Sequence, residues 1–284
     1  MKTLIGIVSY GNLEFLELAL RGIQETLTKQ ADILVVIARP DDTQMQAFLN
    51  ERGIRYIQNH ANIGFAGSIN DIFEAAWVNG DYDNVIIMGN DVIPYPRALD
   101  SMIECAETTD WEWICASQFD SKALVERYPE VRQYFQGDGL VFTDFSARPW
   151  ELHKDFHADN IEPDSLKDVR NLALFKRSVF EKIGYADVNF WPNGYFEDND
   201  AARRANIAGV KSCGLSHAAY FHFWSRTIHQ GEDRGHAKYF IRNMDYYKLK
   251  WGGAVGSESA SPVTSLKIPS REGEEQTINY WRQK

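Results

Sequence analysis

Short runs of β-branched and aliphatic residues alternate with longer stretches of helical periodicity through the first half of the chain. The short runs predict four strands, at residues 3–9, 32–38, 54–58 and 84–88. Between the first two runs, apolar side chains recur at the spacing of one helix face, at Phe15, Leu16, Ala19, Leu20 and Ile23. Further helices are expected at 42–52 and 66–78. This alternation predicts an α/β fold with a mostly parallel central sheet flanked by helices.

The second half of the chain is less regular. We expect strands at 113–117, 171–175 and 218–224, and helices at 96–107, 178–183 and 197–208. The long aromatic and charged stretch 119–168 is expected to be an insertion that is long enough to form a lip beside a site. The Gly- and Ser-rich sequence that follows residue 251 has linker composition. Residues 1–251 are therefore interpreted as one domain and 252–284 as a linker-like tail.

Composition and charge limit the classes of function. The formal net charge is −10, from 30 Lys and Arg against 40 Asp and Glu. Nucleic-acid binding needs clustered cations, so a nucleic-acid acceptor is not favoured. No apolar stretch approaches the roughly 18 residues that span a bilayer, and the N-terminus does not resemble a signal peptide, which predicts a cytoplasmic protein. The three widely spaced cysteines are expected to be buried free thiols: Cys105, Cys115 and Cys213.

Two acidic clusters stand where an α/β sheet places its ligands. The first is Gly-Asn-Asp-Val at 89–92, directly after the apolar run 85–88, and the second is Glu-Asp-Asn-Asp at 197–200, where a helix is predicted to begin. Ligands of open α/β sheets bind where the carboxyl ends of the strands meet the loops. Together the clusters could hold a metal-bound diphosphate and supply a catalytic base.

Several short motifs occur in the order found in one enzyme family. They are Asn-Ile-Gly-Phe-Ala-Gly-Ser-Ile-Asn at 62–70, Asn-Asp-Val at 90–92, Phe-Glu-Asp-Asn-Asp at 196–200, His-Phe-Trp-Ser at 222–225 and Tyr-Tyr-x-x-Lys-Trp-Gly at 246–252. Through them the chain, over about residues 3–252, resembles the GT-A glycosyltransferases of the family 2 type, which includes bacterial rhamnosyl- and galactofuranosyltransferases. The resemblance implies a Rossmann-like GT-A domain with a nucleotide-binding half at about 1–118 and an acceptor and catalytic half at about 119–251.

The resemblance also implies an inverting enzyme that moves a sugar from a nucleoside-diphosphate sugar to a hydroxyl of a glycan or another acceptor. A divalent metal, Mn²⁺ or Mg²⁺, would neutralise the leaving diphosphate, and a carboxylate would take the hydroxyl proton. Asp198 matches the family's catalytic aspartate, and Glu197 is expected to bind acceptor hydroxyls. The alternative is that both are only helix N-terminal acids, which the helix dipole favours. Asp200 is interpreted as structural, in a surface pair with Arg204 at i,i+4 spacing.

Asp91, at a strand tip, is the leading metal ligand, with an Asx turn as the alternative. It falls in the segment that resembles the family's D-x-D region. The family's first aspartate is absent, because positions 89 and 90 are Gly and Asn. Asn90 could donate to a sugar or coordinate a metal weakly. His222, the first residue of the H-x-x-S motif, is the expected second ligand; a core histidine is the alternative, and His217 is the fallback.

The segment 62–70 is expected to line the nucleotide pocket, as the resemblance implies. Its candidate donor-binding residues are Asn62, Gly64, Phe65, Gly67 and Asn70. Residues 68–70 are expected to open a helix whose N–H groups suit an anion; alternatively, the glycines serve only a tight turn. Ser9 and Tyr10, at the end of the first strand, are also placed to contact the donor. The family's base-reading aspartate is missing after the second strand, and Asp41 or Asp42 could replace it.

Two other functions fit part of the sequence. One is a binding module that keeps the nucleotide-sugar fold without turnover, which the neutral Asn90 and the missing base-reading aspartate favour. The other is a nucleotidyltransferase, although residues 9–12 lack the basic, Gly-rich segment that such enzymes carry after the first strand. Three aromatic residues near the second acidic cluster could fill the core or stack on a sugar: Trp191, Tyr195 and Trp224.

Overall fold

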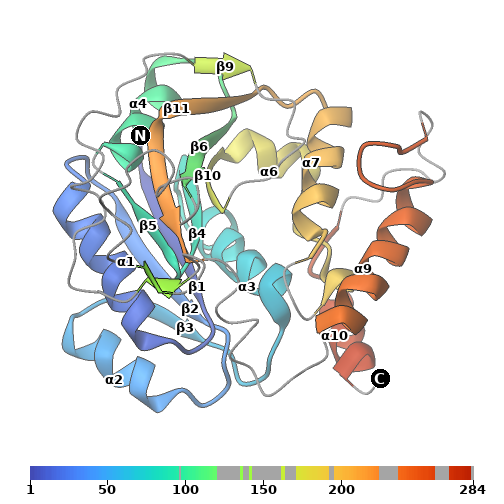
Figure 1. Cartoon of the computed structure of the whole chain (residues 1–284), viewed down its shortest axis with the longest axis horizontal. Helices are drawn as coiled ribbons and strands as arrows, with labels where there is room; N and C mark the ends of the chain where they lie inside the picture. The colour runs from blue at the N-terminus through green and yellow to red at the C-terminus, as the bar shows by residue number, and fades with distance from the viewer. Residues whose placement is uncertain are drawn as a thin grey trace.

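The computed structural model describes residues 1–95, 97–119, 135–136, 141–142, 161–163, 171–191, 195–223, 236–259 and 269–282. Within these ranges the chain forms a mixed α/β structure, in which helices cover both faces of one large, curled sheet (Figure 1). A second, two-stranded sheet is formed by β7 (Phe135–Gln136) and β8 (Val141–Phe142). The predicted fold class is confirmed.

The large sheet has the strand order β3-β2-β1-β4-β10-β6-β11-β5, with β9 (Ile161–Pro163) also paired to β11. Neighbouring strands from β3 to β4 are parallel, and so are β6 and β11. β10 runs antiparallel to both of its neighbours, and β5 runs antiparallel to β11. The strands are β1 (Thr3–Ser9), β2 (Asp32–Ile37), β3 (Arg55–Gln58), β4 (Asn84–Gly89), β5 (Val92–Pro94), β6 (Trp113–Phe119), β10 (Leu172–Lys176) and β11 (Ser212–His222).

Successive side chains of each strand point to opposite faces of the sheet, and different helices pack on the two faces. Ile5 and Ile7 of β1 pack in one core cluster with α1, α2 and α4, whereas Leu4 and Val8 pack in another with α3. Gly6 lets α3 approach closely, since a Cβ there would lie 2.4 Å from Cγ2 of Ile72. The helices are α1 (Leu13–Thr26), α2 (Thr43–Glu51), α3 (Gly64–Phe73), α4 (Ala98–Thr108), α6 (Arg177–Ile183), α7 (Glu197–Ile207), α9 (His236–Trp251) and α10 (Glu274–Arg282).

The helix α7 begins at the end of the sheet where the parallel strands finish. β10 is antiparallel to β4 and β6, so β6, and with it β11, runs in the direction of β1 and β4. Only residues 208–211 join the end of α7 to the start of β11. In Figure 1, α7 accordingly runs opposite to β11, and its first turn points toward the carboxyl ends of β1 and β4. The two acidic clusters therefore share one end of the molecule.

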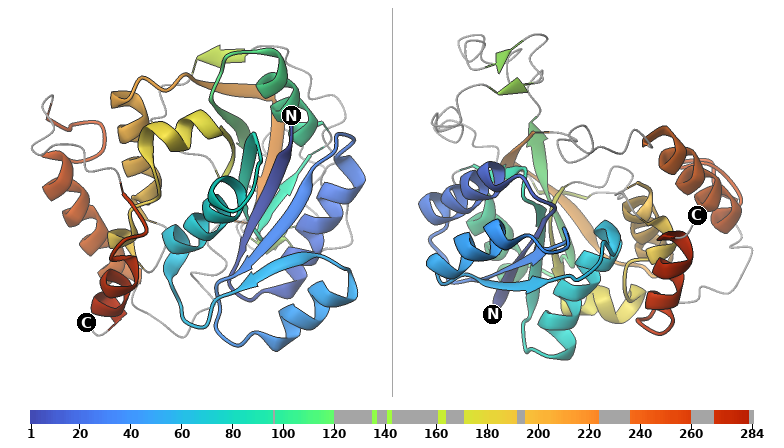
Figure 2. Two further views of the ribbon diagram at one scale, coloured as in Figure 1. Left: turned by 180° about the vertical axis from the view of Figure 1, so that it is seen from behind. Right: turned by 90° about the horizontal axis from the view of Figure 1, so that it is seen from below.

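The segment expected to be a linker-like tail contains a packed helix. Ile278 of α10 is 3% exposed and packs with Ala66 of α3 and with a cluster around Trp191. Arg271 forms an ion pair with Asp71 of α3 at 2.8 Å. Both views of Figure 2 show α9 and α10 on the side of the molecule that carries α7. Within the segment expected to be a linker-like tail, residues 269–282 thus pack against the folded body.

The remaining expectations concern membrane spans and cysteines. Among the helices of the described ranges, none has both the length and the apolar character required to cross a bilayer. Cys105, Cys115 and Cys213 are buried thiols outside any disulfide, as the sequence predicts. Most of the stretch 119–168 lies outside the described residues.

Candidate active site

Asp91 and His222 lie side by side at the carboxyl end of the sheet. Asp91 follows β4, and His222 ends β11, where it is paired with Val92 of β5. The N–H of Phe223 donates to the carbonyl oxygen of Asp91 at 3.0 Å, and this hydrogen bond holds the two segments together. His222 Nε2 lies 3.5 Å from Asp91 Oδ2, and both side chains are largely buried. The structure therefore brings together the two residues that the sequence proposes as metal ligands.

The ring of His222 is contacted on its other side by Asn171, the residue before β10. Asn171 Nδ2 lies 3.1 Å from His222 Nδ1 and donates to Gln118 Oε1 at 3.1 Å. A neutral histidine that binds a metal through Nε2 carries its proton on Nδ1, which then needs an acceptor. With Nδ2 donating to Nδ1, the proton of a neutral His222 ring lies on Nε2, toward Asp91. Metal binding through Nε2 would require the Asn171 amide to turn its Oδ1 toward Nδ1 and to give up its hydrogen bond to Gln118.

The pair Asp91–His222 fits a divalent cation that takes most of its ligands from elsewhere. A carboxylate oxygen and an imidazole nitrogen are both ligands that Mn²⁺ accepts. The part of the chain that the structure describes has no cluster of three or more His, Cys, Asp or Glu side chains able to hold a metal. A cation at Asp91 and His222 would therefore complete its coordination with oxygen atoms of a bound ligand and with water.

Asn90 is buried and braces the loop that follows β1. Its Nδ2 donates to Ser9 Oγ at 3.0 Å and to the carbonyl oxygen of Gly11 at 2.9 Å. Ser9 Oγ also donates to Gly11, at 3.2 Å. A carboxylate at position 90 would set an acceptor against that carbonyl, so the loop requires the amide that the sequence has. The contacts of Asn90 and Ser9 with a donor stay predictions, and Tyr10 beside them is 38% exposed.

The first turn of α7 holds Glu197 and Asp198 with no cation beside them among the described residues. Glu197 is 4% exposed, and its Oε2 is buried without a hydrogen-bond partner in the described part of the chain. Burial, followed by repulsion from Asp198, raises the pKa of Glu197 well above its ordinary value. Burial also raises the pKa of Asp198 to about 6, against the lowering effect of the N–H of Asn199. A carboxyl group whose pKa lies near neutrality is suited to take up a proton during catalysis.

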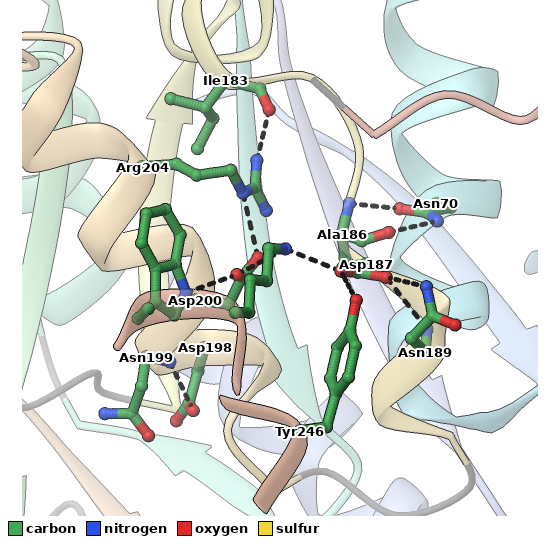
Figure 3. A network of polar contacts seen from close by, with 12 residues as sticks. Asn70, Ile183, Ala186, Asp187, Asn189, Asp198, Asn199, Asp200, Arg204 and Tyr246 are labelled. Atoms are coloured by element: carbon green, nitrogen blue, oxygen red, sulfur yellow. Dashed lines mark hydrogen bonds and ion pairs between the residues drawn. The ribbon is translucent and has the colours of Figure 1, made fainter. Parts of the chain in front are cut away.

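Asp200, two residues farther along α7, has a different environment. Its Oδ2 accepts from Arg204 Nε at 2.9 Å, and its Oδ1 accepts from Trp251 Nε1 at 2.9 Å and lies 2.6 Å from Lys250 Nζ. The Asp200 and Arg204 side chains are 0% and 2% exposed. The pair exists as predicted, but it is buried, so the expectation of a surface pair is wrong. Figure 3 shows Asp198 on the same turn as this network.

The segment 62–70 differs from expectation in where its helix begins. α3 starts at Gly64, whose φ is 75°, and the N–H of Gly64 is bound by Asn62 Oδ1 at 2.9 Å. Residues 68–70 therefore lie inside the helix and offer no free N–H groups to an anion, because its i→i−4 bonds use them. Gly67 packs against Ile63, where an added Cβ would lie 3.1 Å from three side-chain atoms.

Asn70 bonds to the backbone near the second acidic cluster. Its Oδ1 accepts from the N–H of Ala186 at 2.8 Å, and its Nδ2 donates to the Ala186 carbonyl at 3.0 Å. Trp191 Nε1 donates to the carbonyl of Asn62 at 3.0 Å, and Trp191 is 8% exposed. The predicted donor segment is thus tied at both ends to residues 186–191, and Trp191 is a core residue.

Three other candidates have local roles. Asp42 caps α2, since its Oδ1 accepts from the N–H of Met45 at 3.1 Å. Phe65 is partly buried against the core cluster around α3. Tyr195 contacts the ring of Phe240, with centroids 5.3 Å apart. Any contact of these residues with a ligand stays a prediction. Trp224 and the side chain of His217 lie outside the described residues.

The sequence interpretation missed two residues of this region, Asn171 and Lys250. Lys250 belongs to the motif at 246–252, but nothing in the local sequence indicates that its ammonium lies between two buried carboxylates. The sequence places Asn171 only at the start of a predicted strand. Its contact with His222 arises from strand pairing through β10 and β6, which a single sequence does not reveal.

No family model matches the sequence, and no curated protein matches it. The fold resembles the S. aureus TarS fragment 1–349, at 13% identity and a TM-score of 0.57, with 98% of this chain and 78% of that chain covered. It also resembles the mannosyltransferase PcManGT from Pyrobaculum calidifontis in complex with GDP-Man and Mn²⁺, at 14% identity and a TM-score of 0.57, covering 92% and 66%.

A further neighbour is GalNAc-T7 with UDP, GalNAc and Mn²⁺, at 12% identity and a TM-score of 0.59, with 99% of this chain and 57% of that chain covered. This chain thus spans little more than half of GalNAc-T7. At such identities the likeness establishes the fold. The chain has the GT-A fold of these glycosyltransferases.

Proposed function

We propose that this chain is an inverting glycosyltransferase that moves a sugar from a nucleoside-diphosphate donor to a hydroxyl of a glycan or another acceptor. The observation that carries the proposal is the 3.5 Å approach of His222 to Asp91, at the sheet edge where α/β folds bind ligands. The GT-A fold supports it, and PcManGT with the same fold was solved with GDP-Man and Mn²⁺.

In this proposal Asp91 and His222 hold a divalent cation, which supplies positive charge to the leaving diphosphate when it is bound. Asp198 takes the proton of the acceptor hydroxyl while that oxygen attacks the anomeric carbon from the face opposite the diphosphate. Its pKa of about 6 leaves it ionised at neutral pH and basic enough to accept the proton. Glu197, buried beside it, binds an acceptor hydroxyl. A single displacement of this kind inverts the anomeric centre.

The donor is contacted by the segment 62–70 and by Ser9 and Tyr10, with Asp42 as the candidate reader of the base. The sugar belongs to the hexosyl or pentosyl class, and the sequence resemblance favours rhamnose or galactofuranose. A thermal-shift panel tests this: UDP-GlcNAc, GDP-mannose, dTDP-rhamnose and UDP-galactofuranose, each with and without Mn²⁺. A donor that binds only the native state raises the melting temperature.

Hydrolysis of the donor that gives a shift then tests turnover, with water as the acceptor. We expect Mn²⁺-dependent release of the nucleoside diphosphate by the wild-type chain and its loss in Asp198→Ala. If no sugar nucleotide shifts the melting temperature, the proposal fails.

One observation favours a second function, a nucleotide-sugar-binding module without turnover. The amide of Asn90 is used to hold Ser9 and Gly11, so position 90 supplies no carboxylate to a metal. A module of this kind would show the thermal shift and no hydrolysis, with the wild-type chain and Asp198→Ala behaving alike.

A further inference from the structure

The ammonium of Lys250, on α9, lies between two carboxylates from different elements. Its Nζ is 2.6 Å from Asp187 Oδ2 and 2.6 Å from Asp200 Oδ1. The carboxylate side chains are 9% and 0% exposed, and that of Lys250 is 20% exposed. Asp187 precedes the 3₁₀ turn η4 (Val188–Phe190), whereas Asp200 belongs to the first turns of α7. Lys250 is therefore a direct link between the η4 segment and α7.

The neighbouring groups balance the charges of this link and keep Asp187 ionised. Arg204 supplies the second cation for Asp200, so two carboxylates and two cations balance in the buried group. Tyr246, one turn before Lys250 on α9, donates to Asp187 Oδ2 at 2.9 Å. Burial alone would raise the pKa of Asp187, but the charge of Lys250 and the hydrogen bonds from Asn189 bring it below its ordinary value. The carboxylate is thus held ionised where Lys250 can reach it.

Both ends of the link lead to residues of the proposed site. Ala186, next to Asp187, exchanges two hydrogen bonds with Asn70 of the donor segment. At the other end, Asp198 stands two residues before Asp200 on the same helix. A series of contacts and short backbone links therefore runs from Asn70 through Lys250 to the proposed base. Figure 3 shows Asn70, Ala186, Asp187, Asp198 and Asp200 near one another.

We propose that Lys250 is a positioning residue, which fixes the first turn of α7, and with it the carboxylate of Asp198, at a set distance from the donor segment. This inference rests on the proposed function. Lys250 does not touch the reacting atoms; it acts through Asp200. Because a general base must lie within hydrogen-bond reach of the proton that it removes, a small displacement of this turn lowers turnover and leaves donor binding in place.

The experiment compares Lys250→Met with Lys248→Met on the same helix. Lys248 is a matched control, because its side chain is 42% exposed and lies 3.7 Å from Asp245 at the surface. With the donor identified by thermal shift, we expect kcat for hydrolysis to fall about 100-fold in Lys250→Met while KM for the donor changes less than about 3-fold. Lys250→Arg, which keeps a cation between the carboxylates, recovers part of kcat. Lys248→Met leaves both constants unchanged.

A double variant separates positioning from stability. Lys250→Met leaves a buried carboxylate without its cation, which can unfold the protein. Asp187→Asn combined with Lys250→Met removes one charge of each sign, so we expect its melting temperature to return toward the wild-type value while kcat stays low. In this variant, amide hydrogen exchange in the first turn of α7 is expected to be faster than in Lys248→Met.

The outcomes distinguish this inference from the proposed function. A wild-type chain that hydrolyses a donor, together with a double variant of unchanged kcat, would overturn the role of Lys250 and leave the transferase intact. Equal losses in kcat and donor binding would also overturn it, since they indicate a general structural defect. A wild-type chain without turnover of any sugar nucleotide would overturn both.

Discussion

Three carboxylates within one turn of α7 differ in their partners, and this difference separates their roles. Asp200 has Arg204 and Lys250 beside it, whereas Glu197 and Asp198 have no cation among the described residues. A carboxylate that is paired on both oxygens is held in one state and is unsuited to exchange a proton. A desolvated, unpaired carboxylate has a raised pKa and can exchange one. The local environments therefore favour Asp198 over Asp200 as the base.

The same desolvation means that an ionised Asp198 lowers the free energy of unfolding, and this yields a prediction. With a pKa of about 6 in the folded chain and an ordinary value of 3.8, the ionised carboxyl destabilises the native state above about pH 6, and this penalty disappears as the pH falls below about 4. We expect Asp198→Asn to raise the free energy of unfolding by about 1–2 kcal/mol at pH 8 and by much less at pH 4. Urea denaturation at the two pH values measures the difference.

Activity is expected to fall in Asp198→Asn although stability rises. We expect hydrolysis of the donor to be slower by a factor of about 100 or more. A gain in stability joined to a loss of turnover is typical of residues kept for function. Equal stability of the variant and wild type at pH 8 would contradict the desolvated environment assigned to this carboxyl.

Asn171 yields a second prediction, which concerns the metal. If its amide oxygen holds the proton of His222 Nδ1, Asn171→Leu lowers the affinity for Mn²⁺ about 10-fold or more, because His222 then loses the partner that orients its ring. Titration of Mn²⁺, with the free ion followed by electron paramagnetic resonance, measures this. Asn50→Leu, which removes a surface amide bonded to Tyr56 at 3.3 Å, is the control. Unchanged affinity in Asn171→Leu would assign the orientation of His222 to other groups.

At the scale of elements, the first half of the chain was predictable because local pattern and burial agree there. The expected strand at 3–9 is β1, and the strands at 32–38, 54–58 and 84–88 match β2, β3 and β4 within one residue at each end. β1, β2 and β4 are buried over most of their length on both faces, so their apolar runs are continuous, whereas the edge strand β3 is only half-buried. The pattern also placed Asp91 at a strand end, where its contact with His222 forms.

The second half was predicted less well because its elements depend on distant partners. Helix α9 was missed, although Asn243, Tyr247 and Trp251 are buried at intervals of four residues. Asn243 is polar, and its Nδ2 donates to the carbonyls of Phe190 and Tyr195, which are distant in sequence. Strand β5 has three residues, too few to show periodicity. Lys250 was not recognised as buried for the same reason: charged side chains indicate a surface until their partners are known.

The helix α10 yields the third prediction. Ile278 packs with Ala66, Ala186, Val188 and Trp191, and these residues join α10 to the start of α3. We expect Ile278→Ala to lower the free energy of unfolding by about 2 kcal/mol or more, through lost burial and a residual cavity. Tyr280→Ala, two residues away and 53% exposed, is expected to change it by less than about 0.5 kcal/mol. Similar effects of the two substitutions in urea denaturation would mean that α10 contributes little to the folded body.

At the scale of the whole molecule, the two halves named from the sequence interleave within one sheet. β10, from the second half, lies between β4 and β6 of the first. β11, also from the second half, lies between β6 and β5. Each of these first-half strands is hydrogen-bonded to a second-half strand on at least one side. The sheet therefore does not divide between the two halves that the sequence predicts.

This topology predicts that the chain unfolds as a single unit and that residues 1–118 do not fold alone. Without β10 and β11, strands β5 and β6 would lose every strand partner that the structure gives them, and their buried backbone groups would be left unpaired. We expect urea unfolding followed by far-UV circular dichroism and by tryptophan fluorescence to give coincident transitions, since Trp77 and Trp251 report on different halves. The isolated fragment 1–118 is expected to lack a cooperative transition. Two separated transitions in the full chain, or a fragment that melts cooperatively, would show that the first four strands and their helices form a unit stable without the rest of the sheet.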